Sequence, residues 1–65
     1  MHLIVANDRV RLQEPLPELE LVAGEVGQVV SAWFYPNTAY EVEFSSSEMP
    51  CGRRVLLLHD QIAKL

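Results

Sequence analysis

Two glycines, Gly24 and Gly27, stand three residues apart in the segment AGEVGQVV, a spacing that could form a loop that cradles a phosphate. Such loops join a strand to a helix whose N-terminal amides face the phosphate, and the Walker version adds a lysine followed by serine or threonine. Here no lysine follows, Glu25 would repel an anion, and the next residues, QVVSAWFY, have the composition of a strand. We therefore interpret both glycines as structural. Gly24 would take a positive φ at a turn, and Gly27 would allow a bulge or a close contact between strands.

The remaining residues that could support metal binding or nucleophilic chemistry are His2, Cys51, His59 and Asp60. A zinc site needs three or four ligands with at least one close pair. Only His59 and Asp60 are close, and adjacent residues on a strand point to opposite faces. We interpret Asp60 as a cap of the short turn that follows it. A Cys51–His59 nucleophile pair stays open, although so short a chain offers little room for a pocket of several hundred Å³. We expect no catalytic residue, no metal and no cofactor, and therefore no enzyme.

The aromatic residues point to binding rather than catalysis. Tyr40 and Phe44 alternate with Val42 in the segment AYEVEF and are expected in the core. The consecutive residues 33–35 (Trp, Phe, Tyr) cannot all face a core, so either Trp33 and Tyr35 point outward or the phenylalanine between them does. Trp33 would be either a lid over one end of the core or a contact for a partner. Tryptophan and tyrosine are enriched where binding energy concentrates.

Acidic residues crowd the segment after the first strand and project from one face of a later strand. One interpretation is a solvated surface that keeps a small domain soluble. The other is a surface that attracts a basic partner through complementary charge. On the second interpretation the candidate partner-binding residues are Glu14, Glu18, Glu20, Trp33, Tyr35, Glu41 and Glu43.

Length and charge limit the classes of function. The 65 residues form one domain, residues 1–65, and the formal net charge of −4 with only five basic residues makes nucleic acid an unlikely partner. Cys51 is the only cysteine, which excludes an intrachain disulfide and favours a reducing cytoplasm. The apolar run in MHLIVAND is too short for a signal peptide or a membrane span, so we expect no membrane association. That segment would form a strand or a packed arm.

Strand patterns dominate the chain. Period-two alternation marks residues 8–13 and 39–44, and β-branched and aromatic residues fill 27–35. The apolar run RRVLLL, residues 53–58, is typical of a strand covered on both sides or at a barrel seam. Residues 59–61 should form a 3₁₀ turn before a short last strand.

Loops should separate these strands. Pro15 and Pro17 disfavour both helix and ladder pairing, which predicts a long, acidic, partly extended first loop. A tight turn is expected at residues 36–38, and a polar loop at residues 45–52.

Five short strands need closure to protect their edges. The predicted fold is all-β: a small five-stranded SH3-like barrel with a long acidic first loop and a short 3₁₀ turn before the last strand.

The segments DRVRL, GEVGQVV, YEVEF and DQIAKL resemble a family of short bacterial proteins classed as a domain of unknown function (the 4926 series). The resemblance runs from about Asp8 to Leu65. It implies an SH3-like fold and brings no catalytic residue with it. Members are sometimes regarded as partners of a neighbouring small protein, in the manner of an antitoxin or immunity protein. The Gly-x-x-Gly-x-Val segment is also similar to KOW-type barrels and to the small subunits of nitrile hydratases. The loop SSSEMPCG and the run WFY depart from the family pattern, so the resemblance names no partner.

Three functions remain open. The first is a non-catalytic protein-interaction module, of the antitoxin or immunity type, that binds a basic partner as a monomer or weak homodimer. The second is a KOW-like nucleic-acid-binding barrel that would gather Arg9, Arg11, Arg53 and Arg54 on one side. The third is an accessory subunit or domain of a larger enzyme assembly.

Overall fold

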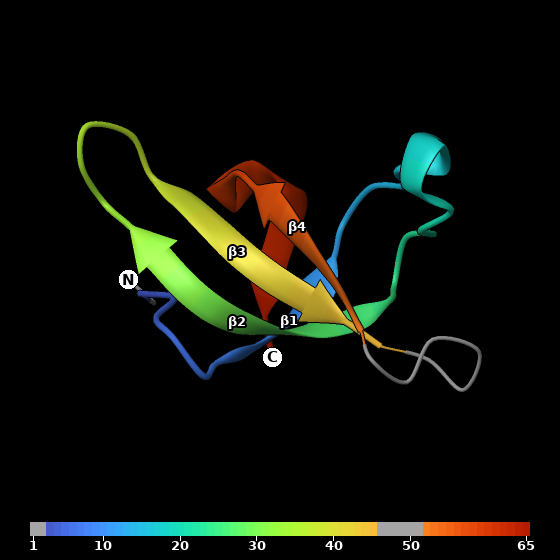
Figure 1. Ribbon diagram of the computed structural model, residues 1–65, viewed down its shortest axis with the longest axis horizontal. Helices are drawn as coiled ribbons and strands as arrows, with labels where there is room; N and C mark the ends of the chain where they lie inside the picture. The colour runs from blue at the N-terminus through green and yellow to red at the C-terminus, as the bar shows by residue number, and fades with distance from the viewer. Residues whose placement is uncertain (1–2, 46–51) are drawn as a thin grey trace.

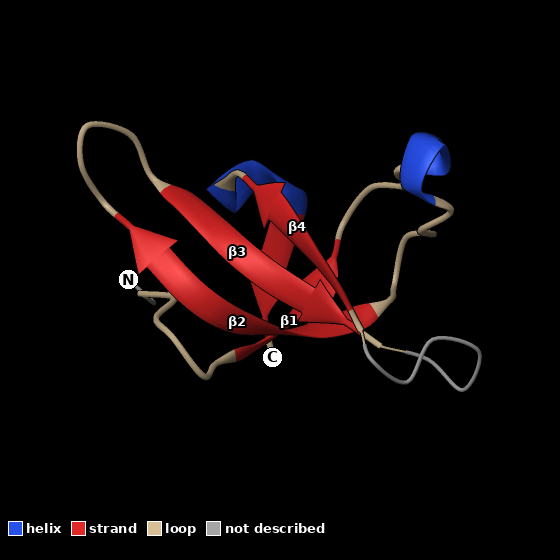
Figure 2. Ribbon diagram, viewed as in Figure 1, coloured by secondary structure: helices blue, strands red, loops and turns tan. Residues whose placement is uncertain are grey.

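The computed structural model describes residues 3–45 and 52–65. In this part of the chain five strands form one antiparallel sheet in the order β4-β3-β2-β1-β5, and the only helical segments are two 3₁₀ turns (Figures 1 and 2). The elements are β1 (Arg9–Leu12), η1 (Pro17–Leu19), β2 (Val26–Trp33), β3 (Ala39–Phe44), β4 (Arg53–Leu57), η2 (His59–Gln61) and β5 (Ile62–Lys64). The predicted all-β class is confirmed, with a 3₁₀ turn before the last strand. The sheet is a small, barrel-like fold, and the finer SH3-like assignment stays a prediction.

The core lies on the inner face of this sheet. Along β1 and β3 the side chains alternate strictly between exposed or half-buried and buried, as a strand with one face toward a core requires. Tyr40, Val42 and Phe44 are all buried, as expected from their shared face. The buried hydrophobic residues are Ile4, Val10, Leu12, Leu21, Val29, Tyr40, Val42, Phe44, Leu57 and Ile62.

The two glycines occupy different kinds of position around the start of β2. Gly24 has a φ of +97° in a turn where the Glu25 carboxylate accepts a hydrogen bond from the Val22 amide at 2.8 Å. Gly27 is buried and lies against β3, where a Cβ atom would come within 2.9 Å of the Glu43 carbonyl oxygen. The irregularity of the β2–β3 ladder lies further along, between Val29 and Ser31. Gly27 is therefore the site of a close strand contact and not of the bulge.

The first loop is more ordered than its two prolines led us to expect. Pro17 begins η1, and Leu16 forms an isolated antiparallel bridge with Leu21. The prolines were expected to disfavour helical and ladder structure here, and the segment is a long loop that contains only one 3₁₀ turn and one bridge. The turn is compatible with Pro17, because proline fits the first position of a helical turn, where its missing N–H would have no partner. Leu16 and Leu19 pack against the core, and Arg53 of β4 donates a hydrogen bond to the Leu19 carbonyl.

The strand β4 is covered on one face only. Leu57 is buried and Val55 half-buried, whereas Leu56 is 65% exposed. Of the two alternatives, cover on both sides is contradicted, because only the inner face of β4 meets the core. A position at a barrel seam stays a prediction, and β4 does lie at an edge of the sheet. An unbroken apolar run is compatible both with a strand covered on two faces and with a strand covered on one.

The segment before β1 is a packed arm. Ile4 is buried, and the Asn7 amide donates a hydrogen bond to the Val29 carbonyl at 2.8 Å. The Asp8 carboxylate accepts from the Val5 amide at 2.9 Å and lies 3.4 Å from the Lys64 ammonium. These contacts lower the pKa of Asp8, chiefly through the hydrogen bond from Val5. No helix among residues 3–45 and 52–65 is long and apolar enough to cross a membrane.

Candidate functional site

The three consecutive aromatic residues are all exposed at the end of the β2–β3 hairpin. Trp33 is 44%, Phe34 49% and Tyr35 89% exposed. We expected the core to take at least one of them, because alternation along a strand sends neighbours to opposite faces. However, β2 ends at Trp33, so alternation does not govern the two residues that follow.

Trp33 and Phe34 nevertheless have different surroundings. Trp33 pairs with Ala39, a neighbour of the buried Tyr40, so Trp33 projects from the outer face of the sheet. The ring of Phe34 meets that of Tyr40 edge to face, with centroids 6.3 Å apart and planes at 81°. Phe34 therefore contacts a core residue, whereas Trp33 lies on the outer face of the sheet and does not cover the core.

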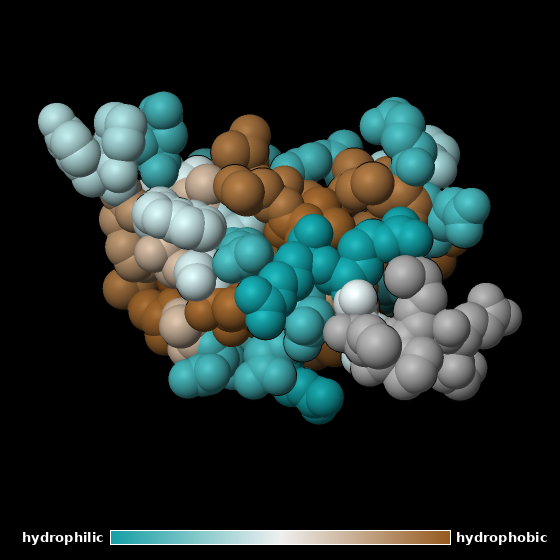
Figure 3. All heavy atoms as spheres, in the orientation of Figure 1, coloured by the Kyte–Doolittle hydropathy of each residue, from teal (hydrophilic) through white to brown (hydrophobic). Residues whose placement is uncertain are grey.

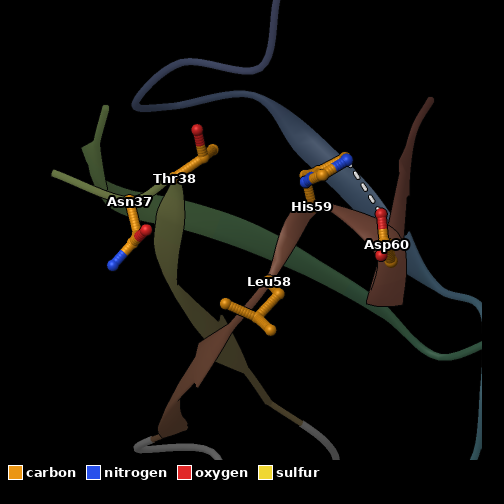
Figure 4. A pocket seen from close by; sticks show the side chains of 5 residues that line it. All are labelled: Asn37, Thr38, Leu58, His59 and Asp60. Atoms are coloured by element: carbon orange, nitrogen blue, oxygen red, sulfur yellow. Dashed lines mark ion pairs between the residues drawn. The ribbon is translucent and has the colours of Figure 1, made fainter. Parts of the chain in front are cut away.

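A pocket of about 460 Å³ lies between the β2–β3 loop and η2, lined by Asn37, Thr38, Leu58, His59 and Asp60 (Figure 4). The volume is larger than we expected of so short a chain, but four of the five lining residues are exposed, so the pocket is an open depression and not an enclosed cavity. The pocket forms at one end of the antiparallel β3–β4 pair, where the loop before β3 lies beside η2, which follows β4. Its lining offers an amide, a hydroxyl, an imidazole and a carboxylate around one leucine.

The polar pair in this pocket is open to solvent. His59 Nε2 lies 2.8 Å from Asp60 Oδ1, with side chains 66% and 80% exposed (Figure 4). The two side chains meet because η2 is a 3₁₀ turn, so the strand rule that would separate them does not apply. The turn is capped by Gln61 and not by Asp60, since the Gln61 Oε1 atom accepts a hydrogen bond from the Leu58 amide at 2.9 Å.

Gln13, at the end of β1, fixes the position of η2. Its side-chain amide donates to the carbonyls of Asp60 and Ile62 at 3.3 and 2.9 Å. Such a pocket can hold a polar or cationic group by hydrogen bonds and charge. In the part of the chain that the structure describes, no three His, Cys, Asp or Glu residues gather as metal ligands would. Cys51 lies outside the described residues, so its pairing with His59 stays a prediction.

The two strand carboxylates predicted to bind a partner have different neighbours. Glu43 lies between Gln28 and Arg54 in the ladder, and its Oε2 atom is 3.5 Å from Arg54 Nε. Glu41 lies between Ser31 and Leu56, and no ion pair is found for it among the described residues. Glu41 is therefore the better placed of the two to meet a basic group on a partner.

The acidic residues of the first loop lie far from the aromatic residues. Glu14, Glu18 and Glu20 are all exposed in and around η1, at the end of the molecule opposite the β2–β3 loop (Figure 1). Arg53, which contacts η1, faces Phe44, whereas Trp33 faces Ala39. Five residues of strand correspond to about 17 Å. The predicted partner-binding set is thus divided between two ends of the sheet, and only Trp33, Tyr35 and Glu41 share the hairpin end.

The four arginines considered for nucleic acid are not equivalent. Arg9 and Arg54 belong to one cross-strand row, but Gln28 and Glu43 lie between them. Arg53 has the same parity along β4 as the inward-facing Val55 and reaches η1 instead. The row is therefore mixed in charge. A phosphate backbone binds to clustered basic residues, and this row does not provide a continuous basic stripe.

The sequence did not single out Leu56, Leu58, Asn37 and Thr38, which surround the hairpin end. Leu56 and Leu58 were assigned to a strand covered on both sides or at a barrel seam, and the turn residues were assigned to a loop without further role. Figure 3 shows hydrophobic surface, in brown, exposed beside polar groups on one face of the molecule. Had the sequence shown that β4 is an edge strand, Leu56 and Leu58 would have been considered as candidate contact residues.

Comparison with known proteins gives one match. The model of the family described as Domain of unknown function (DUF4926) matches residues 6–51. No curated protein and no solved structure matches the chain.

Proposed function

The chain belongs to the family described as a domain of unknown function (DUF4926), and we propose that it is a non-catalytic protein-interaction module. Its binding surface would be the hairpin end: Trp33, Tyr35, Glu41, Leu56 and the pocket beside η2. The partner would be a neighbouring small protein with a basic surface, bound in the manner of an antitoxin or immunity protein in the cytoplasm.

The observation that carries this proposal is the exposure of large apolar side chains in adjacent rows of one sheet. Trp33 pairs with Ala39, and the next outer row contains Glu41 and Leu56. Leu58, which is 55% exposed, follows β4 on the same side as Leu56 and lines the pocket. A contiguous apolar patch rimmed by polar groups is typical of a protein–protein contact.

The charges around this patch favour a basic partner. The carboxylates of Glu41 and Asp60 lie on its borders, and the chain as a whole carries a net charge of −4. A lysine or arginine on the partner could reach Glu41 beside Leu56, or Asp60 in the pocket. Complementary charge of this kind raises the rate of encounter and selects the orientation of binding.

The test is to co-express the chain with the product of the neighbouring gene, purify the complex and measure the dissociation constant by calorimetry. The variant Trp33→Ala/Tyr35→Ala should weaken binding by at least about 10-fold, because aromatic anchors dominate interface energies. Val22→Ala is the matched control, since Val22 is 63% exposed beside Gly24 at the other end of the sheet. It should change affinity less than about twofold. Equal affinity of the aromatic variant and the wild type would refute the proposal.

A third variant separates the two ends of the molecule. Glu18→Lys/Glu20→Lys reverses charge in the first loop alone. If the hairpin end is the contact surface, this variant should slow association modestly and leave the dissociation rate unchanged. A loss of binding confined to this variant would move the contact to η1.

The nucleic-acid and accessory-subunit alternatives are tested with the same protein. Trp33 is the only tryptophan, so its fluorescence reports directly on occupancy of the hairpin end. Titration with short RNA and DNA at low salt should leave this signal unchanged, whereas a KOW-like function would produce salt-sensitive binding. Copurification with the subunits of a large enzyme would favour the accessory role.

A further inference from the structure

The outer edge of β4 has the properties of a strand that can accept another strand. In the described sheet β4 is paired with β3 alone, so alternate backbone N–H and C=O groups point away from the sheet. Residues 53–57 contain no proline and no glycine, and the β3–β4 ladder is regular over Arg53–Leu57. Proline and a bulge, two of the devices that block an edge, are therefore missing from this strand. Its charges are confined to the first two residues, Arg53 and Arg54, and leave residues 55–57 uncharged.

The outward side chains along this edge are self-complementary. In chain order they are the basic Arg54 and the apolar Leu56 and Leu58. The exposed, acidic Asp60 follows in η2, where strand alternation no longer holds. An antiparallel partner reverses that order. A second β4 paired about Leu56 would place Leu56 against its own copy, and each Arg54 beside Leu58 and close to Asp60 of the other chain.

Other arrangements of two β4 strands are less favourable. Parallel pairing in register places Arg54 beside Arg54, and an antiparallel pair centred on Arg54 does the same. Like charges directly opposite each other destabilise a sheet. Antiparallel pairing about Leu57 would set Arg54 directly opposite Asp60, but it would require residues of η2 to pair as a strand, which a 3₁₀ turn cannot do. The register about Leu56 keeps like charges apart and pairs only the extended residues 54–58.

We propose that two copies of this chain associate through antiparallel pairing of β4 about a two-fold axis at Leu56. The interface is isologous, because each Arg54 uses the same groups on the other copy. Arg54 can keep its contact with Glu43 in the dimer, since a guanidinium has five N–H donors. The two proposals rest on different observations but share Leu56 and the residues of the pocket, so a second copy and a partner would compete for that edge. Trp33 and Tyr35 lie beyond the paired edge, on and after β2, and belong to the partner surface alone.

The association should be weak. A ladder of five residues with two leucines on each side falls below the roughly 1,000 Å² that a stable specific interface buries. Sedimentation equilibrium of the full chain should therefore show the mass rising with concentration, from 7.4 kDa toward twice that value. A mass of 7.4 kDa up to about 1 mM, the weak limit for specific pairs, would overturn the proposal.

Two leucines of similar exposure provide a matched pair of variants. Leu56→Lys places two like charges opposite each other and should weaken association at least about 10-fold, since a like-charged pair replaces an apolar contact. Leu65→Lys changes a residue that is 61% exposed, against 65% for Leu56, but follows β5 at the opposite edge of the sheet, and should leave association unchanged. Equal loss in both variants, or retention in both, would contradict β4 pairing.

Charge exchange tests the register. Asp60→Lys alone should weaken the dimer, and so should Arg54→Asp, with circular dichroism confirming that each variant is folded. The double variant Arg54→Asp/Asp60→Lys should recover association, because the exchanged charges again meet across the two-fold axis. If both single variants weaken the dimer and the double variant does not recover it, the proposed register is wrong. If Arg54→Asp does not fold, loss of association in Asp60→Lys still supports this register, and its retention contradicts it.

Discussion

Gly27→Ala should destabilise the fold through a steric conflict between β2 and β3. A Cβ atom at Gly27 would lie 2.7 Å from Val42 Cγ1, 2.9 Å from the Glu43 carbonyl oxygen and 2.9 Å from Phe44 Cδ1. The Val42 methyl group belongs to a fully buried side chain, and the carbonyl belongs to the backbone of the ladder. Ordinary contacts of this kind begin at 3.4 Å, so the two strands must separate locally by about half an ångström.

The magnitude follows from two opposing effects. Overpacking a well-packed core costs about 1–3 kcal/mol. Replacing glycine by alanine also restricts the unfolded chain, which returns about 0.4–1 kcal/mol where the native φ suits alanine. The net loss should be about 1–2 kcal/mol, or a fall in Tm of roughly 4–16 °C for a domain of this size. That is a large share of the roughly 3–10 kcal/mol expected for such a chain.

Gly24→Ala provides the control, because it differs in mechanism. No atom lies within 4 Å of a Cβ at Gly24, but its φ is +97°. Its cost is therefore a backbone cost of about 1–2 kcal/mol, and a change in β3 should not alter it. Both variants can be followed by urea denaturation with Trp33 fluorescence.

A double-mutant cycle with Val42→Ala distinguishes the two mechanisms. Removing the Val42 methyl groups relieves part of the conflict at Gly27, so the pair should show a coupling of at least about 0.5 kcal/mol, while Gly24 and Val42 should be additive. Relief should be incomplete, because the Glu43 carbonyl stays in place. A Gly27→Ala protein as stable as the wild type, or strict additivity with Val42→Ala, would refute this account of the strand contact.

Three further predictions concern other parts of the fold. Leu57→Ala should cost about 2–5 kcal/mol in urea denaturation, because Leu57 is 2% exposed and its removal leaves a cavity. Phe34→Ala should cost about 0.5–1.5 kcal/mol, the worth of an aromatic pair, and should expose Tyr40 to fluorescence quenchers. Asp8 has a folded-state pKa below its ordinary value of 3.8, so its stabilising contribution is present above that value and is lost as the pH falls through the folded pKa. The free energy of unfolding should therefore fall more steeply with acidification below about pH 4 in the wild type than in Asp8→Asn.

The strands could be read from the sequence where the pattern is local. The alternation in AYEVEF predicts β3 because one face of a strand toward a core requires that pattern whatever the neighbours are. The burial of β4 could not be read in the same way. Whether Leu56 is covered depends on whether anything packs on the outer face of the sheet, and the pattern within residues 53–58 does not contain that information.

The candidate site shows the same limit. That at least one of the three consecutive aromatic residues points outward could be anticipated, because they exceed what one strand face can bury. Which of them does so stayed open, and Trp33 faces outward as one of the two alternatives required. The separation of Glu18 from Trp33 could not be anticipated, because it depends on which end of the sheet each loop occupies. The pocket depends on the β3–β4 register, which brings Thr38 beside His59 across about 20 positions of sequence.

The outer face of the sheet changes in character along β3, and this change links the two proposals. The row that contains Glu43 is charged, with Arg54 on one side and Gln28 on the other. The row of Glu41 is mixed, and the row of Ala39 begins with Trp33. The core does not require this gradient, because the buried residues lie on the opposite face. Apolar groups at one end are therefore best explained by contacts outside the chain. A partner at the hairpin end and a second copy along the β4 edge would both cover Leu56, whereas only the partner would cover Trp33. Substitution of Trp33 should consequently weaken hetero-association alone, and substitution of Leu56 should weaken both.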